Sequence, residues 1–164
     1  MTFDKDITIA FSGHRTYRGE AGDELRCAVQ ELYDRGYIRF LCGMAWGFDL
    51  SAGEAVAALR QEHPEVKLVA VLPFKSFHRL FSGDDAERFR RLASVADEVV
   101  VVSSSDNKAS FRMRNDFLVD NASCLVAWYD GGTKGGTAYT VKRARRKGLL
   151  VENLYPLPQL ELEF

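Results

Sequence analysis

The chain has 164 residues, of which 46% are hydrophobic and 27% charged, a composition typical of a soluble globular domain with one core. Its net charge of −1 creates no strong field, so a nucleic-acid partner is disfavoured and no membrane partner is expected. No run approaches the ~18 apolar residues of a membrane span, and the acidic N-terminus does not resemble a signal peptide.

The first predicted strand covers residues 7–11, and five more apolar runs follow it. Most of the runs are nearly continuous rather than alternating, as expected for strands that helices cover on both faces. The other five are 38–42, 67–72, 98–102, 124–128 and 149–154.

Segments with helical spacing lie between these runs. The first has an apolar stripe from Leu25 to Tyr33 and a stop at Gly36. The second has Ser51 and Glu54 at the spacing of a capping box. The last four segments are 49–62, 84–93, 110–121 and 136–147.

This alternation of strands and helices predicts parallel βαβ units. We expect residues 1–164 to form a single α/β domain, a Rossmann-like three-layer sandwich with a mainly parallel six-stranded sheet, in which residues 156–164 extend one edge. Such sheets bind ligands beyond the carboxyl ends of the strands, where the strand order reverses. The loops after the strands are therefore the predicted site.

The loop after the first run contains Ser12, Gly13, His14 and Arg15. The glycine permits close backbone approach, and the arginine can pair with a phosphate or a carboxylate. The alternative is a plain turn with solvated charges. The loop does not have the GxGxxG pattern of dinucleotide-binding folds, so no cofactor is predicted.

The loop after the second run contains Gly43 and Gly47, which can turn backbone amides toward a ligand. Asp49 is expected to be the N-cap of the next helix rather than a catalytic group, and the loop would then contact a ribose or a base. Trp46 and Phe48 are either stacking surfaces for that ligand or packing residues.

After the fourth run, Arg112 and Arg114 fall in the first turns of a predicted helix, where the helix dipole disfavours cations. Arg114 also lies beside the apolar stripe, so it needs a partner. Either Asp106, Asp116 or Asp120 pairs with it, or it binds an anion.

The fifth loop contains the glycine-rich stretch GGTKGGT, residues 131–137. Gly135, Gly136 and Thr137 stand at a helix start and can present several amides and a hydroxyl to one phosphate. The stretch is not a Walker A loop, because Lys134 precedes the glycine pair.

Three other features of the sequence need an interpretation. Phe74, Phe77 and Phe81 recur at helical spacing and form either a satellite core or an exposed patch, and the exposed patch would predict a homo-oligomer. The basic run 142–147 is interpreted as a solvated helix end. Three cysteines, Cys27, Cys42 and Cys124, lack metal-ligand spacing, so we expect reduced thiols, a cytoplasmic location and no metal.

Four motifs together resemble the YpsA-like branch of the SLOG superfamily, which includes relatives of the DNA-processing protein DprA and of the Lonely Guy phosphoribohydrolases. The resemblance covers about residues 7–154 and implies a Rossmann-like sheet with a site for a nucleotide or a nucleotide-derived ligand. The motifs are FSGHR, CGMAWGFDLSAGEAV, RMRNDFLVDNASCLVAWYDG and KGGTAYTV.

One departure from the Lonely Guy pattern bears on catalysis. Arg114 matches the arginine of those enzymes, but their catalytic glutamate aligns with Thr140, whose hydroxyl is a poor acid–base group.

The first hypothesis is therefore a cytosolic binding or sensor protein for a nucleotide-type ligand. The second is a hydrolase or transferase acting on a nucleoside monophosphate or a nucleotide sugar, in which Asp49, His14 or Glu54 replaces the glutamate. A nucleic-acid-binding accessory protein is the third hypothesis.

Overall fold

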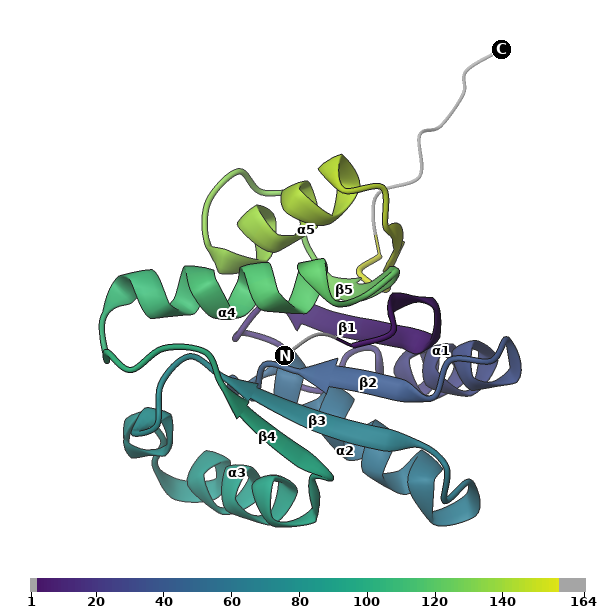
Figure 1. The fold of residues 1–164 in the computed structure, drawn as a ribbon, viewed down its shortest axis with the longest axis horizontal. Helices are drawn as coiled ribbons and strands as arrows, with labels where there is room; N and C mark the ends of the chain where they lie inside the picture. Colours follow the sequence, from purple (N-terminus) through teal and green to yellow (C-terminus); the bar gives the residue numbers. More distant parts are fainter. Residues whose placement is uncertain (1–2, 157–164) are drawn as a thin grey trace.

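All six predicted runs are strands of one parallel sheet, in a computed structural model that describes residues 3–156 (Figure 1). The strand order is β4-β3-β2-β1-β5-β6, and every neighbouring pair is parallel. The predicted α/β fold is confirmed. The predicted edge extension lies outside the described residues apart from Pro156. The strands are β1 (Thr8–Gly13), β2 (Arg39–Cys42), β3 (Lys67–Leu72), β4 (Glu98–Val101), β5 (Cys124–Trp128) and β6 (Leu150–Asn153).

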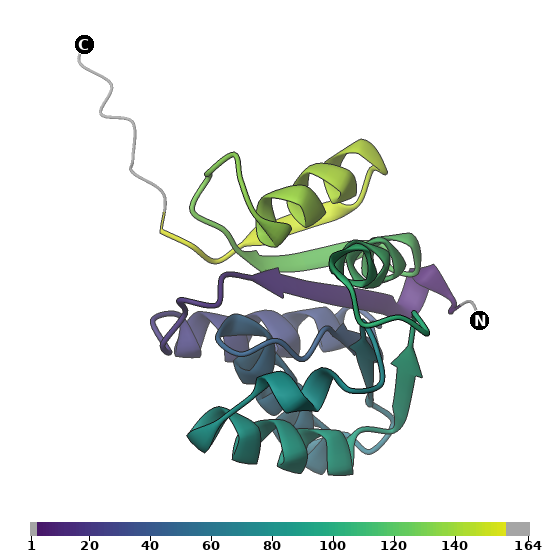
Figure 2. The same ribbon diagram turned by 90° about the vertical axis from the view of Figure 1, so that its left-hand side faces the viewer.

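Helices form the two outer layers, as Figure 2 shows. Three of them pack on one face and two on the other, and each face has its own cluster of buried side chains. No helix within residues 3–156 is long and apolar enough to cross a membrane. The first face carries α1 (Gly22–Asp34), α2 (Phe48–Glu62) and α3 (Gly83–Val95), and the second carries α4 (Lys108–Asp120) and α5 (Gly136–Arg146).

The strand order reverses between β1 and β5. From β1 the chain moves outward through β2 and β3 to β4, and α4 then carries it back across the sheet to β5 on the other side of β1. Gly13 lies opposite Trp128 in the β1–β5 register, so the loops that follow these two strands start side by side. This is the place where open parallel sheets bind ligands.

The expectation that helices cover both faces of most strands does not extend to the two edge strands. Val99 and Val101 of β4 are 51% and 43% exposed, and Leu150 of β6 is 52% exposed. An edge strand has a neighbour on one side only, so its apolar side chains are shielded less than those of the central strands.

The predicted capping box in α2 is also wrong. Gly47 is the N-cap, so Ser51 and Glu54 lie inside the helix. Both bind Arg88 of α3, whose Nη2 donates to Ser51 Oγ at 3.2 Å and whose Nε donates to Glu54 Oε2 at 3.1 Å. These side chains join two helices and do not cap one.

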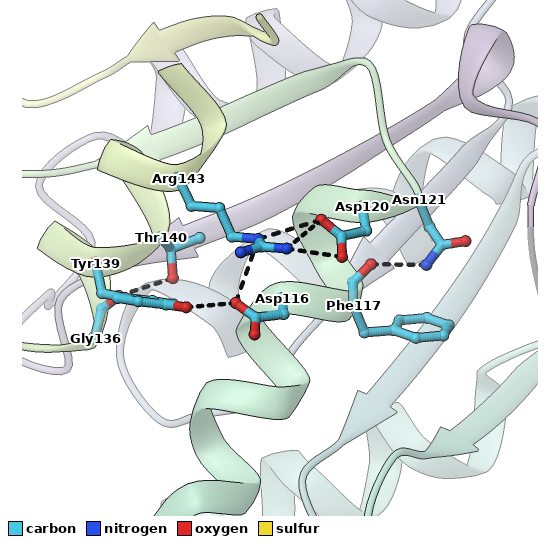
Figure 3. Close-up of polar contacts among 8 residues, drawn as sticks. All are labelled: Asp116, Phe117, Asp120, Asn121, Gly136, Tyr139, Thr140 and Arg143. Carbon is cyan, nitrogen blue, oxygen red and sulfur yellow. Dashed lines mark hydrogen bonds and ion pairs between the residues drawn. The ribbon is translucent and has the colours of Figure 1, made fainter. Parts of the chain in front are cut away.

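A polar seam joins α4 to α5 (Figure 3). Arg143 Nη2 donates to both carboxylate oxygens of Asp120, at 2.9 and 3.0 Å, and Arg143 Nε lies 3.3 Å from Asp116 Oδ1. The Tyr139 hydroxyl donates to the same Asp116 oxygen at 2.7 Å. Arg143 is therefore not a solvated member of the basic run 142–147, as the sequence predicted, but fixes the spacing of the two helices.

Replacing Arg143 with Ala should lower the free energy of unfolding by about 1 kcal/mol, because it removes a bidentate, partly buried ion pair. Urea denaturation of the wild type and Arg143→Ala measures this change. Arg145→Ala, at an exposed position on the same helix, is the matched control and should leave the midpoint unchanged. Equal midpoints for all three proteins would contradict a stabilising role for the seam.

The aromatic segment after β3 belongs to the core. Phe77 is fully buried and Phe74 is 6% exposed, and the Phe77 ring packs edge-on against Phe81 and Phe111. The rings face inward, so they do not form the exposed patch on which the prediction of a homo-oligomer rested.

Candidate functional site

A cavity of about 780 Å³ lies where the strand order reverses, and four parts of the chain form its walls. These are the loop after β1, the start of α2, the middle of α4 and the glycine-rich loop that leads into α5. Cavities of this size accommodate ligands as large as a nucleotide.

Arg114 reaches this cavity from α4 and is only 5% exposed. Its Nη1 donates to the Gly43 carbonyl, and its Nε donates to Asn115 Oδ1 at 2.8 Å. No aspartate forms an ion pair with it among the described residues, so the predicted pairing with Asp106, Asp116 or Asp120 does not occur.

The third nitrogen of this guanidinium is free. Nη2 of Arg114 makes no hydrogen bond within residues 3–156. It is also not among the sealed, unpaired side-chain atoms of that region, which are Asp49 Oδ1 and Trp128 Nε1. Nη2 is therefore not sealed in the interior, and Arg114 lines the cavity. Gly43 makes room for this arrangement, because a Cβ there would lie 2.8 Å from Nη1 of Arg114.

Asp49 is the buried carboxylate of the site. It lies in the first turn of α2 rather than at the predicted N-cap position, and it is 6% exposed. Its Oδ2 accepts a long hydrogen bond of 3.4 Å from the Ala45 amide. Burial raises the pKa of Asp49 to about 6, although the Arg114 and Arg15 guanidinium groups act in the opposite direction.

Arg15 is the second guanidinium at this cavity. Its Cζ stacks 4.1 Å from the centroid of the Trp46 ring, and no described carboxylate forms an ion pair with it. Partial burial lowers the pKa of Arg15, and Asp49 opposes that shift. Trp46 thus holds Arg15 in place, whereas Phe48 is a core residue that packs directly against Gly13.

The glycine-rich loop ends in an uncapped helix. Gly135 is the N-cap of α5 with φ 97°, a conformation that favours glycine, and no side chain caps the helix. The first backbone bond of α5 runs from the Tyr139 amide to the Gly135 carbonyl. The amides of Gly136, Thr137 and the next residue therefore have no acceptor within the helix, and the helix dipole makes this end attractive to anions.

His14 ties the two central loops together. The Asp130 amide donates to His14 Nε2 at 3.1 Å, and the His14 amide donates to the Trp128 carbonyl at 3.2 Å. The Gly132 amide in turn donates to Asp130 Oδ1 at 2.9 Å, and this bond lowers the pKa of Asp130. The histidine thus orders the rim of the cavity.

Most of the residues that the sequence predicted for the site meet at this cavity, but three glycines do not line it. Gly43 and Gly47 are outside this lining, and a Cβ on Gly47 would meet the Arg15 carbonyl at 2.6 Å. Gly135 also stands outside the lining, at the bend before α5. The predicted residues that line the cavity are Ser12, Gly13, His14, Arg15, Asp49, Arg114, Gly136 and Thr137.

Thr140 is fully buried and does not line the cavity. Its hydroxyl donates to the Gly136 carbonyl at 2.8 Å, inside α5. The polar lining residues that were not among the predicted site residues include Asn115 and Asp130. Their positions gave a usable signal, because one adjoins Arg114 and the other directly follows β5.

The site offers donors to an anion rather than ligands to a metal. Arg114, Arg15, Lys134 and the α5 amides supply positive charge or N–H groups, and Asp49 and Asp130 are the acids in the lining. The described residues contain no group of three histidines, cysteines or acids that could hold a metal ion.

Comparison with known proteins agrees with this architecture. The chain is 30% identical to an uncharacterised SPbeta prophage-derived protein, YoqJ, of Bacillus subtilis over 156 residues, which cover 86% of this chain and 91% of YoqJ. It is 29% identical to a UPF0398 protein of Bacillus cereus over 130 residues, which cover 73% and 71% of the two chains.

Two solved structures of DNA processing protein A have a similar fold. The Streptococcus pneumoniae protein has a TM-score of 0.66 at 19% identity, and the match covers 97% of this chain but only about half, 52%, of that protein. The Helicobacter pylori protein has a TM-score of 0.61 at 18% identity, with coverage of 99% and 72%, and is described as binding single-stranded DNA.

These neighbours overturn the prediction that a nucleic-acid partner is disfavoured. That prediction used the net charge, which sums over the whole surface and carries no information on a cavity lined by local cations. The predicted relationship itself is confirmed, because the family model described as the YspA SLOG family matches residues 22–162. The chain belongs to the YspA SLOG family.

Proposed function

We propose that this protein binds a nucleotide through its phosphate, as a binding or sensor protein of the cytoplasm. The phosphate would accept hydrogen bonds from the α5 amides, from Thr137 and from the free nitrogen of Arg114. Arg15 would add a second cation at the rim. Each charge-assisted hydrogen bond contributes about 1.5–3 kcal/mol, and two or three of them support micromolar affinity, which corresponds to about −8 kcal/mol.

The observation that carries this proposal is the buried guanidinium without a carboxylate partner. Burying an arginine is costly unless its charge is matched, and a 5% exposed arginine normally pairs with an acid. Here Asp49 stands near Arg114 without an ion pair, and Nη2 of Arg114 remains available. A phosphate in the cavity would complete this arrangement.

The apolar part of the lining suits a nucleoside. Phe11, Phe111 and Leu118 line the same cavity as the cations, so a base or sugar can pack beside a bound phosphate. We propose binding without hydrolysis, since Thr140 faces away from the cavity and Oδ1 of Asp49 is sealed. General acid–base assistance is worth about 10²–10⁴ in rate, and the exposed carboxylate of the lining, Asp130, already accepts a hydrogen bond from the Gly132 amide.

The test is titration calorimetry with AMP, adenosine and inorganic phosphate. We expect a micromolar Kd for AMP and binding at least tenfold weaker for adenosine, because the phosphate supplies most of the free energy. The same AMP samples are analysed by chromatography for free adenine, and none is expected. If AMP does not bind more tightly than ~1 mM, the proposal fails. Rapid release of adenine would instead show an enzyme.

A second candidate is binding of single-stranded DNA, which the fold likeness to the Helicobacter pylori protein supports. A DNA strand would place one of its phosphates at the same cations. Fluorescence anisotropy with a labelled oligothymidylate at 50 and 200 mM salt separates the two candidates. A polyanion that contacts several cations loses affinity steeply with salt, whereas a single phosphate loses little.

A further inference from the structure

A second cavity of about 610 Å³ adjoins the nucleotide site, and Arg15 lines both. The loop after β1, the start of α2 and the first turn of α3 form its walls. Its lining includes Tyr17, Arg18, Trp46 and Asp84. A ligand longer than one nucleotide could therefore pass from the first cavity to the second across a single side chain.

The guanidinium of Arg15, at this boundary, has all of its N–H donors available. Within residues 3–156 its guanidinium makes no hydrogen bond and no ion pair, although five N–H donors are present. The Trp46 ring lies 4.1 Å from the Arg15 Cζ and attracts the guanidinium through a cation–π contact. An unpaired guanidinium between two cavities is suited to a phosphate that lies between two larger groups.

The second cavity differs chemically from the first. Arg88 in the wall of the second cavity already donates hydrogen bonds to Glu54 and Ser51, so it is not available to a phosphate. The guanidinium of Arg18 and the carboxylate of Asp84 are unpaired within the described part of the chain. One unpaired cation and one unpaired acid beside an indole ring suit a neutral group with N–H and O–H donors and a flat face, such as a nucleoside.

We propose that the two cavities bind one ligand made of two nucleosides joined through phosphate, with Arg15 on the joining phosphate. This inference rests on the proposed nucleotide function and names its ligand class. The first nucleoside occupies the cavity of Arg114, and the second lies between Trp46, Arg18 and Asp84. A pyrophosphate-linked dinucleotide and the end of a single-stranded nucleic acid share this chemistry.

The experiment compares four probes by calorimetry: AMP, ADP, diadenosine pyrophosphate and the 5′-phosphorylated dinucleotide pApA. ADP is the control for added phosphate charge without a second nucleoside. We expect at least one two-nucleoside probe to bind tenfold or more tighter than ADP. Preference for diadenosine pyrophosphate identifies a small-molecule ligand, and preference for pApA identifies a nucleic-acid end.

Variants confined to the second cavity test the assignment. Arg18→Ala combined with Asp84→Ala should retain the AMP affinity and lose the tenfold gain, because neither residue lines the first cavity. Arg145→Ala, far along α5, is the control and should keep both.

Two results would overturn this inference. One is that both two-nucleoside probes bind no tighter than ADP while AMP binds, which leaves the nucleotide function intact. The other is that the gain persists in the double variant. Failure of all four probes, AMP included, would overturn the nucleotide function together with this inference.

Discussion

Arg114→Ala should weaken AMP binding about 10- to 100-fold while the protein stays folded. The reason is that one or more charge-assisted hydrogen bonds disappear, each worth about 1.5–3 kcal/mol, and ~1.4 kcal/mol corresponds to a factor of ten. The loss should exceed that for any rim residue, since the Arg114 guanidinium is fixed by Gly43 and Asn115 before the ligand arrives. A preorganised donor loses little entropy on binding. Calorimetry with AMP measures the change.

Two further variants separate binding from folding. Arg114→Lys keeps the charge but not the fork of donors, so it should recover only part of the affinity. Arg112→Ala removes a neighbouring arginine that stacks 4.9 Å from the Tyr139 ring centroid, away from the cavity lining, and should bind AMP as the wild type does. If Arg114→Ala lowers the urea midpoint and leaves the AMP affinity unchanged, the arginine is structural and the site lies elsewhere.

The fold was predictable because its signals are local. Strands such as β3 and β5 are continuous apolar runs whose bounds the sequence gives to the residue, and helix stripes such as that of α1 have an unambiguous period. The resemblance to the SLOG superfamily covered nearly all of these strands and helices, so the apolar pattern and the family resemblance predicted the same architecture. The edges were the exception, because an apolar run does not reveal which strand lacks a second neighbour.

The site was predictable only as far as the topology dictates it. Loops after parallel strands meet at one edge, which brought Arg15, Arg114 and Thr137 to one cavity. The roles of the glycines were not predictable. Gly13 admits the Phe48 ring and Gly47 admits the Arg15 backbone, and both are tertiary contacts that no local pattern encodes. For the same reason an alignment could not show that Thr140 turns away from the cavity.

The net charge gave a wrong prediction about a nucleic-acid partner for a related reason. The net charge of −1 is a sum over cations and anions that lie far apart in the fold. Arg143 is neutralised in the α4–α5 seam, and Arg88 of α3 is neutralised by Glu54 of α2, whereas Arg15 and Arg114 remain available at the cavity. A partner encounters this local excess of positive charge, which can be recognised only after the ion pairs have been assigned.

Anion binding should weaken as the pH rises through about 6, the value to which burial raises the pKa of Asp49. Below that pH the carboxyl is neutral, so Arg114 and Arg15 attract an anion without competition. Above it, the carboxylate neutralises part of their charge and repels the ligand, so binding requires uptake of a proton. By linkage, affinity falls by up to tenfold per pH unit above the pKa, and we expect a loss of about tenfold between pH 5 and pH 7.5.

Sulfate is the appropriate probe, because its charge is constant over this range whereas a phosphate monoester titrates near pH 6. The measurements use a His14→Gln background, which removes the imidazole from the lining. The other groups that face Asp49 keep their charge: Arg114 and Arg15 stay cationic, and burial raises the pKa of the Cys42 thiol further from this range.

Asp49→Asn in that background should bind sulfate equally at pH 5 and pH 7.5, with the affinity that the parent shows at pH 5. Asp130→Asn is the matched control, because the Gly132 amide lowers the pKa of Asp130 and keeps it ionised throughout. That variant should retain the full pH dependence. If the parent and Asp49→Asn have the same pH profile, Asp49 does not share the guanidinium groups with the ligand, and the anion must bind away from the α2 end of the cavity.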